Sequence, residues 1–270
     1  IRAGPFVMKK VSKSIPTRHY GFSLLGILIS LACMVMLMSI YMTSVDKAVT
    51  GGQGNSVKQS VWGMQDQIQM QLVGQGLTIH AMTNGEGFLI PSKLSGSNDV
   101  TENTSANFWS ALILQNLVAA KQLVSPTDRG WVEEAPYSRN RSLWDPDFSA
   151  DLDETSNVSY AHMPLYGERL KKRWSPGAGR FPIIGNRGPK DGIENTDSFT
   201  LDDDGIWRGW VLHADNAIEW VKGTSVVSKW RRGDGETQDN LFLYEGDSAD
   251  DAMLGFTIEM YDNGPVFVWD

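Results

Sequence analysis

Cysteine is almost absent from this sequence: Cys33 is the only one in 270 residues, and it lies inside a long apolar run. The chain after that run has no cysteine at all. This part therefore cannot form a disulfide, a thiolate metal site or a cysteine nucleophile. A domain of roughly 200 residues buries enough surface to fold without covalent cross-links.

Positive charge is scarce beyond the first 21 residues. The whole chain has 24 Lys and Arg against 32 Asp and Glu, a net charge of −8. Five cations precede Gly21, where there is no acidic residue: Arg2, Lys9, Lys10, Lys13 and Arg18. Without them the chain has 19 basic and 32 acidic side chains, a net charge of −13. Binding of nucleic acid requires a basic face, so nucleic acid is excluded as an expected partner.

The run from Phe22 to Met42 contains no charged residue. A helix of this length, at about 1.5 Å per residue, crosses a hydrocarbon core of roughly 30 Å. The run exceeds the apolar region of a secretory signal, typically about 7–15 residues, and no small-residue cleavage site follows it. The basic flank predicts a cytoplasmic N-terminus, with residues 43–270 outside. Met8, followed by Lys9 and Lys10, resembles a natural translation start. The sequence therefore allows either Ile1 or Met8 as the first residue of the protein.

The residues GFSLLGIL at 21–28 resemble the type IV prepilin signature, in which a basic leader precedes Gly, Phe and a hydrophobic helix. In that family a membrane peptidase cuts after the Gly and methylates the new N-terminal Phe. The resemblance implies processing between Gly21 and Phe22. The family has Glu at the fifth mature position, where this chain has Gly26, and this departure favours a minor pseudopilin over a major filament subunit. A plain signal anchor is the alternative.

Beyond the membrane run, the pattern predicts a long helix over residues 56–83. Its apolar positions are spaced to share one helical face, which we expect to lie on a sheet: Val57, Val61, Met64, Ile68, Leu72 and Ile79. Asn84 to Gly87 ends this helix. An extended segment at Phe88–Leu94 and a second helix at Phe108–Lys121, capped by Ser105 or Asn107, follow.

The remaining chain is predicted to be loop-rich and then antiparallel. Residues Gly130–Pro189 form an irregular insert with one short strand at Ser156–Met163. A hairpin covers Trp207–Gly223, turning at Asp215 and Asn216. Further strands are expected at Asn240–Tyr244, Leu254–Met260 and Val266–Trp269. The fold class is α+β: a long N-terminal hydrophobic helix as in pilins, then a loop-rich domain with a C-terminal antiparallel sheet.

The domain organisation follows from these boundaries. Residues 1–21 are a leader that is cleaved, residues 22–42 are the transmembrane helix, residues 43–59 are a glycine-containing linker, and residues 60–270 are the globular domain. Three short segments of that domain resemble the pilin-like proteins common in planctomycete bacteria: Phe88–Pro91, Leu123–Asp128 and Leu212–Val221. This second resemblance implies a cell-envelope role without catalytic chemistry.

Acidic loops supply the candidate metal ligands. The first choice for a calcium site is one loop region, because calcium takes several oxygen ligands from such loops: Asp191, Glu194, Asp197, Asp202 and Asp204. No segment has EF-hand spacing, and solvated acidic turns are the competing interpretation. No other cofactor is expected.

Catalytic motifs are missing. His80, His162 and His213 are dispersed and lie in no hydrolase or metalloprotease pattern, so we interpret them as surface or core residues and expect no enzyme. All ten tryptophans lie outside the apolar run. Exposed indoles would suit sugar stacking, but the alternation around Trp207 and Trp220 predicts the packed face of a sheet.

Together these features predict a non-enzymatic, pseudopilin-like subunit of a type II secretion or type IV pilus-like assembly in a bacterial inner membrane. Its expected partners are the membrane, the prepilin peptidase and other pilin or pseudopilin subunits. The alternative is a single-span, membrane-anchored extracellular glycan-binding module that uses exposed tryptophans, and an anchored hydrolase ranks third.

Overall fold

The computed structural model describes residues 56–85, 87–128, 132–136, 142–152, 155–193, 205–228 and 237–269. Lys58–Asp270 forms one compact unit, and Ile1–Val57 is a separate unit. The predicted leader, the membrane run and most of the linker lie outside the described residues. Within the described ranges, no helix combines the length and apolarity that crossing a bilayer requires.

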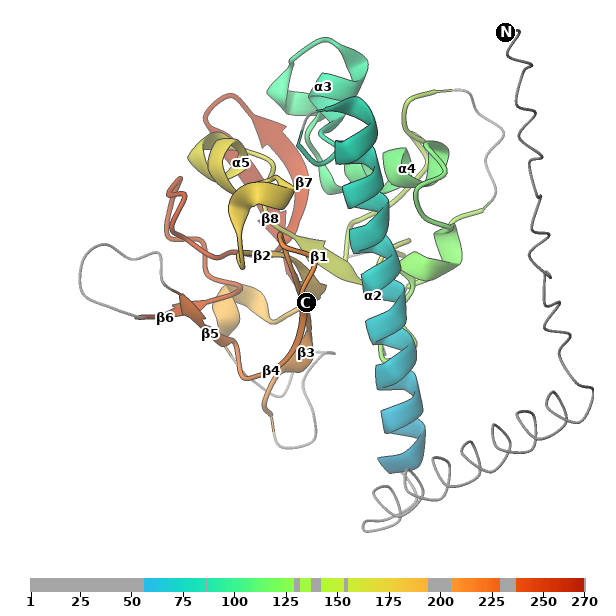
Figure 1. Ribbon diagram of the computed structural model, residues 1–270, viewed down its shortest axis with the longest axis vertical. Coiled ribbons are helices and arrows are strands. Elements are labelled where there is room, and N and C mark those ends of the chain that lie inside the picture. Colours follow the sequence, from blue (N-terminus) through green and yellow to red (C-terminus); the bar gives the residue numbers. More distant parts are fainter. Residues whose placement is uncertain are drawn as a thin grey trace, which may run out of the picture. The chain divides into compact units, whose positions relative to one another are not determined.

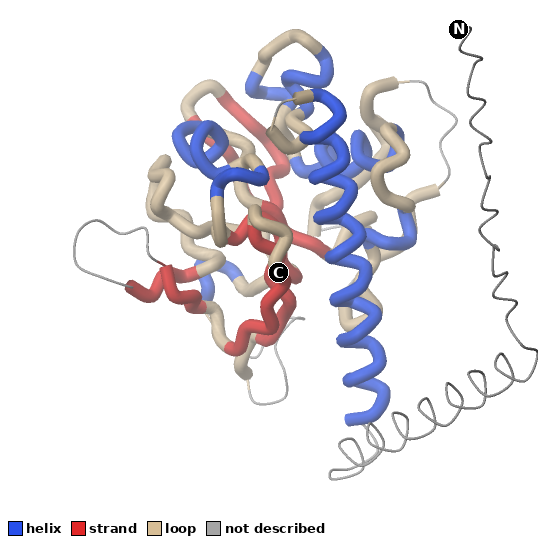
Figure 2. Tube along the Cα trace, in the orientation of Figure 1, coloured by secondary structure: helices blue, strands red, loops and turns tan. Residues whose placement is uncertain are grey.

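The α-helices lie mainly in the first half of the unit and the antiparallel strands in the second half, which confirms the α+β class (Figures 1 and 2). The α-helices are α2 (Ser56–Asn84), α3 (Pro91–Ser95), α4 (Ser105–Leu114) and α5 (Gly167–Arg173). The strands are β1 (Tyr160–His162), β2 (Pro182–Asn186), β3 (Arg208–His213), β4 (Ile218–Lys222), β5 (Ser225–Ser228), β6 (Thr237–Asn240), β7 (Phe256–Tyr261) and β8 (Gly264–Val268). Short 3₁₀ turns lie at Val100–Glu102, Ala120–Leu123, Pro176–Ala178 and Lys190–Gly192.

Helix α2 matches its predicted bounds closely. It ends at Asn84 because Gly85 adopts a positive φ of 68°, and the Gly85 N–H donates to Ala81 O at 3.0 Å. Glycine reaches this left-handed conformation without steric cost, so it caps a helix well. In Figure 1 the helix runs along the side of the strands as the longest element of the unit.

The predicted orientation of α2 is wrong. The face that packs on the domain carries Met70, Val73, Leu77 and Ala81, all buried, together with a buried Asp66. The apolar residues expected to lie on the sheet are exposed instead: Met64, Ile68, Leu72 and Ile79. The helix has two apolar faces, and periodicity alone does not rank them.

Two glycines explain which face of α2 packs inward. A Cβ atom at Gly74 would come within 2.3 Å of Asn216 Oδ1 and 2.9 Å of a Leu212 methyl carbon. A Cβ at Gly76 would lie 2.7 Å from the Leu117 carbonyl oxygen. The backbone of α2 therefore approaches the β3–β4 hairpin and the chain after α4 more closely than any larger residue permits.

The main sheet has four antiparallel strands in the order β1-β2-β3-β4. The predicted β3–β4 hairpin is confirmed, and Asn216 takes the positive φ of 64° that its turn requires. Strand β2 lies inside the segment predicted to be irregular. All five of its residues are buried, so it shows no polar–apolar alternation and its sequence is not recognised as a strand.

Several other predicted boundaries are corrected. Pro91 begins α3 instead of marking an extended segment, because proline fits the first turn of a helix. The helix predicted over Phe108–Lys121 is α4, which is capped by Thr104 and ends at Leu114. The strand expected at Asn240–Tyr244 is wrong, because β6 ends at Asn240 and Leu241–Tyr244 form a turn and a loop. Helix α5 lies within the predicted irregular insert.

The C-terminal hairpin β7–β8 joins the main sheet through β1. His162 and Gly255 exchange two backbone hydrogen bonds, and the Thr257 N–H donates to Ser105 Oγ at 2.8 Å. The core of the unit is rich in aromatic side chains, among them Phe108, Trp109, Trp174 and Trp207. The hairpin thus closes one side of the core.

Candidate functional site

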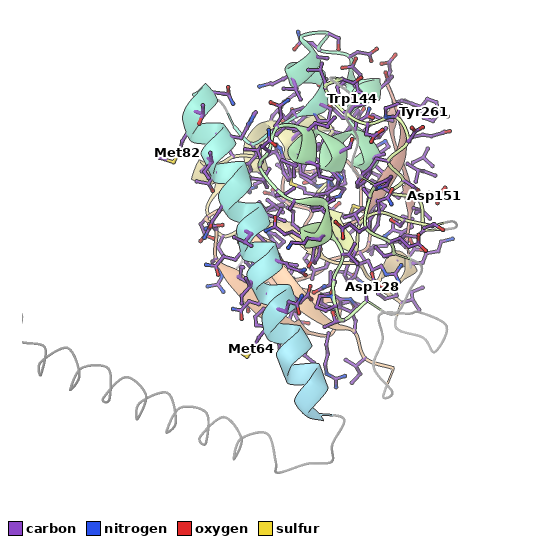
Figure 3. All side chains as sticks on the ribbon, turned by 90° about the vertical axis from the view of Figure 1, so that its right-hand side faces the viewer. Met64, Met82, Asp128, Trp144, Asp151 and Tyr261 are labelled. Atoms are coloured by element: carbon purple, nitrogen blue, oxygen red, sulfur yellow. The ribbon has the colours of Figure 1, made fainter. Side chains whose placement is uncertain are left out.

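The exposed face of α2 is the most unusual surface of the unit. Its large apolar side chains recur at spacings of three, four and seven residues, and each exposes 36–80% of its surface: Met64, Ile68, Leu72, Ile79 and Met82. Figure 3 shows Met64 and Met82 on the side of the helix turned away from the rest of the unit. We call this set the outer face of α2.

The outer face also lacks charge. Between residues 63 and 85 the only Asp, Glu, Lys or Arg is Asp66, and it is buried on the opposite face. Gln65, Gln71 and Gln75 supply most of the exposed polar groups. Solvent-facing helices normally carry charged residues on this side. An apolar, uncharged face is instead characteristic of a contact surface.

Asp66 anchors the inner face of α2 to the sheet. Its carboxylate accepts hydrogen bonds from Tyr160 Oη at 2.6 Å, from Asn186 Nδ2 at 2.8 Å and from Thr127 Oγ1 at 3.2 Å. Burial raises the pKa of Asp66, although these donors favour the ionised form. A single carboxylate in an otherwise uncharged helical stretch was the signal in the sequence that such a buried anchor existed.

A buried ion pair lies in the same region, between Arg187 and Asp128 at 2.6 Å. It stands close enough to Tyr160 for the Asp128 charge to help raise the pKa of that phenol, after burial as the main cause. Both side chains of the pair are 4% exposed, so it belongs to the interior of the unit.

Of the predicted calcium ligands, only Asp191 belongs to the described residues. It lies in the turn Lys190–Gly192 with a positive φ of 56° and is half-buried. Glu194, Asp197, Asp202 and Asp204 lie outside the described residues, as do the processing positions Gly21, Phe22 and Gly26. The described residues therefore do not test whether the five predicted calcium ligands lie close together.

A different acidic cluster does come together. Carboxylate oxygens of Asp239, Glu245 and Asp251 lie within 4.8 Å of one another, beside an open cavity of about 340 Å³ lined by Glu245, Ser248, Asp250 and Asp251. Arg169 already pairs with Asp251 at 2.5 Å. Asp239 accepts a hydrogen bond from the Ala252 N–H at 3.0 Å. These partners account for the cluster as a structural element.

The histidines take three different environments. His80 is half-exposed on α2, and His213 is buried on β3. His162 is fully buried: its Nδ1 lies 2.7 Å from the Met163 carbonyl oxygen, so Nδ1 carries the proton and Nε2 accepts the Ser105 hydroxyl at 2.7 Å. Although this is the hydrogen-bond pattern of a serine–histidine pair, neither side chain has exposed surface to offer a substrate.

The tryptophan prediction is half right. Trp207 is buried, as expected for the packed face of the sheet, whereas Trp220 exposes 48% of its surface on β4. Trp220 lies across from Trp210, with ring centroids 5.1 Å apart, and the Trp210 Nε1–H donates to Gly63 O on α2. Because α2 covers part of Trp210 and the outermost strand β4 carries Trp220, the indole of Trp220 is the more exposed of this pair.

Comparison with known proteins, by family model, by curated sequence and by solved structure, finds no match to this chain.

Proposed function

We propose that this chain is a non-enzymatic, membrane-anchored subunit of a pseudopilin-like assembly in a bacterial envelope, cleaved after Gly21. The observation that carries the proposal is the outer face of α2. Its apolar, uncharged surface follows the apolar run Phe22–Met42 in sequence. A subunit built this way buries the outer face against the helix of a neighbouring subunit, while the domain faces outward.

The energy available to this contact is substantial. Five large apolar side chains lie between Met64 and Met82 of the helix, and full burial of each such side chain contributes roughly 1.5–3 kcal/mol. Ordering the partners offsets part of this gain. Since the face has no charged group to desolvate, little of the gain is lost to that cost.

Replacement of Ile68 by Glu tests the contact. We expect this variant to lose self-association by more than tenfold, because a carboxylate would be buried without a partner. Gln67→Glu is the matched control, since it adds the same charge to the same helix but next to Ile68 in sequence, where neighbouring side chains point in different directions around the helix axis. The measurement is cross-linking of the full chain in membranes, and equal cross-linking of Ile68→Glu and wild type would rule the contact out.

The mature N-terminus tests the processing step separately. Mass spectrometry of the protein purified from membranes is expected to show Phe22 as the first residue, carrying one methyl group. A retained basic leader would favour the plain signal anchor over the prepilin resemblance.

A glycan-binding module is the second candidate, and one described residue, Trp220, supports it. The half-exposed indole of Trp220, held by Trp210, offers a flat aromatic face of the kind that stacks on sugars. It ranks second because Trp109, Trp174 and Trp207 are core residues.

A further inference from the structure

His213 is a buried imidazole whose Nδ1 has no hydrogen bond among the described residues and whose Nε2 has only a long contact, with Glu219. The side chain exposes only 5% of its surface, and both Nδ1 and Nε2 are closed off from solvent. A buried polar group without a good hydrogen bond loses the interaction with water that it has in the unfolded chain. A ligand bound to the ring nitrogen would replace this lost interaction.

Glu219 lies on the neighbouring strand β4, diagonally across from His213. Its Oε2 lies 3.5 Å from His213 Nε2, beyond the usual 2.7–3.2 Å of a hydrogen bond. Two donor atoms bound to one tetrahedral zinc ion, at about 2.0–2.1 Å each, lie roughly 3.3 Å apart. The separation therefore fits two ligands of a single ion better than a direct contact.

The strands hold these two side chains in place. His213 ends β3 opposite Pro182 of β2, and Val211 pairs with Glu219 across the β3–β4 hairpin. The His213 N–H donates to Ala217 O at 2.9 Å, which closes the hairpin turn. Glu219 is 46% exposed, so water can complete the coordination from the solvent side.

We propose that His213 and Glu219 bind a divalent transition-metal ion of the zinc class on the β3–β4 hairpin. The site is independent of the outer face of α2 and of the proposed assembly. A neutral imidazole with one carboxylate suits Zn²⁺, Ni²⁺ or Cu²⁺, whereas Ca²⁺ and Mg²⁺ prefer all-oxygen sites.

The guanidinium of Arg180 contacts the carboxylate oxygen that the metal ion would bind. Its Nη2 donates to the same Glu219 Oε2 at 2.8 Å. Both side chains of this pair are exposed, and an exposed ion pair is weak because water screens it. An incoming cation therefore displaces Arg180 at little cost.

Calorimetric titration of the purified full chain with zinc, in detergent, tests the site. We expect saturable zinc binding by the wild type. His213→Gln and Glu219→Gln should each lower the zinc affinity by at least roughly 100-fold, because loss of a residue that only orients a metal ligand already lowers the affinity about 10–100-fold. His80→Gln is the matched control and is expected to bind as wild type. Arg180→Met should tighten binding by about two- to fivefold, because the competing cation is removed.

Three outcomes would overturn the proposal: no saturable zinc binding by wild type, wild-type affinity in Glu219→Gln, or competition by Ca²⁺ at equal concentration. Circular dichroism of each variant checks folding. If His213→Gln does not fold, Glu219→Gln decides the question, because its side chain is half-exposed and its loss leaves the hairpin packing intact.

Discussion

Replacement of Arg169 by Met is expected to lower the free energy of unfolding by about 3–5 kcal/mol. Arg169 is 1% exposed, and its guanidinium donates to Asp251 Oδ2 at 2.5 Å, to Asp251 O at 2.8 Å and to Gly246 O at 2.9 Å. Its carbon Cζ lies 5.6 Å from the centre of the Tyr244 ring. The substitution leaves Asp251 as a buried carboxylate without its counter-charge, which is the costly part of the change.

Lys171→Met is the matched control, on the same helix α5. Lys171 also pairs with a carboxylate, Glu168 at 3.0 Å, but the Lys171 side chain is 70% exposed. Its loss should cost far less than that of Arg169, because water screens an exposed ion pair. Urea unfolding followed by tryptophan fluorescence measures both variants. Similar losses in the two would mean that burial does not set the strength of the Arg169 pair.

Lowering the pH from 6.5 to about 4 should remove about 3 kcal/mol of stability through His162. Burial lowers the pKa of His162 to about 4, from 6.5 in an unfolded chain. Between these values the unfolded chain binds a proton that the folded chain does not. The contribution is therefore complete above pH 6.5 and is lost as the pH falls toward 4.

The surroundings of His162 explain the direction of this shift. The rings of Phe108, Trp109 and Trp174 lie around the imidazole, with centroids 4.8, 5.9 and 6.3 Å from its own. Its hydrogen bonds are to neutral groups, the Ser105 hydroxyl and the Met163 carbonyl. No charged side chain is among the causes of the shift, so nothing nearby compensates a buried imidazolium.

The measurement is the slope of unfolding free energy against pH, compared between wild type and His162→Gln. The comparison isolates His162 from two other groups. Burial also lowers the pKa of His213, which adds to the slope, whereas the raised pKa of Asp66 gives a slope of the opposite sign above pH 3.8. An unchanged slope in His162→Gln would contradict the prediction, whatever the absolute stability of the variant.

Local patterns predicted the elements that depend on local chemistry. The bounds of α2 follow from its helical spacing and from the glycine after Asn84. The β3–β4 hairpin follows from two apolar runs around Asp215 and Asn216. In both cases the deciding interactions join residues close in sequence, so neither depended on the rest of the fold.

Strand β2 and helix α5 could not be found in this way. Each is short, and β2 is buried along its whole length because it lies between β1 and β3. Its structure is set by partners 22 to 31 residues away on either side, including Tyr160 opposite Asn186 and Val211 opposite Gly185. Such pairing carries no periodic signal in the strand itself.

Taken alone, the sequence established the charge asymmetry, the single cysteine in an apolar run and the existence and ends of α2. Tertiary structure alone decided which face of α2 is buried, because that choice rests on contacts of Gly74 and Gly76 with segments more than 35 residues away. It also decided that Asp66 is an internal anchor and that His213 faces Glu219. Composition and spacing specify which surfaces a helix can offer, but only the packed partners determine which of them is left to solvent.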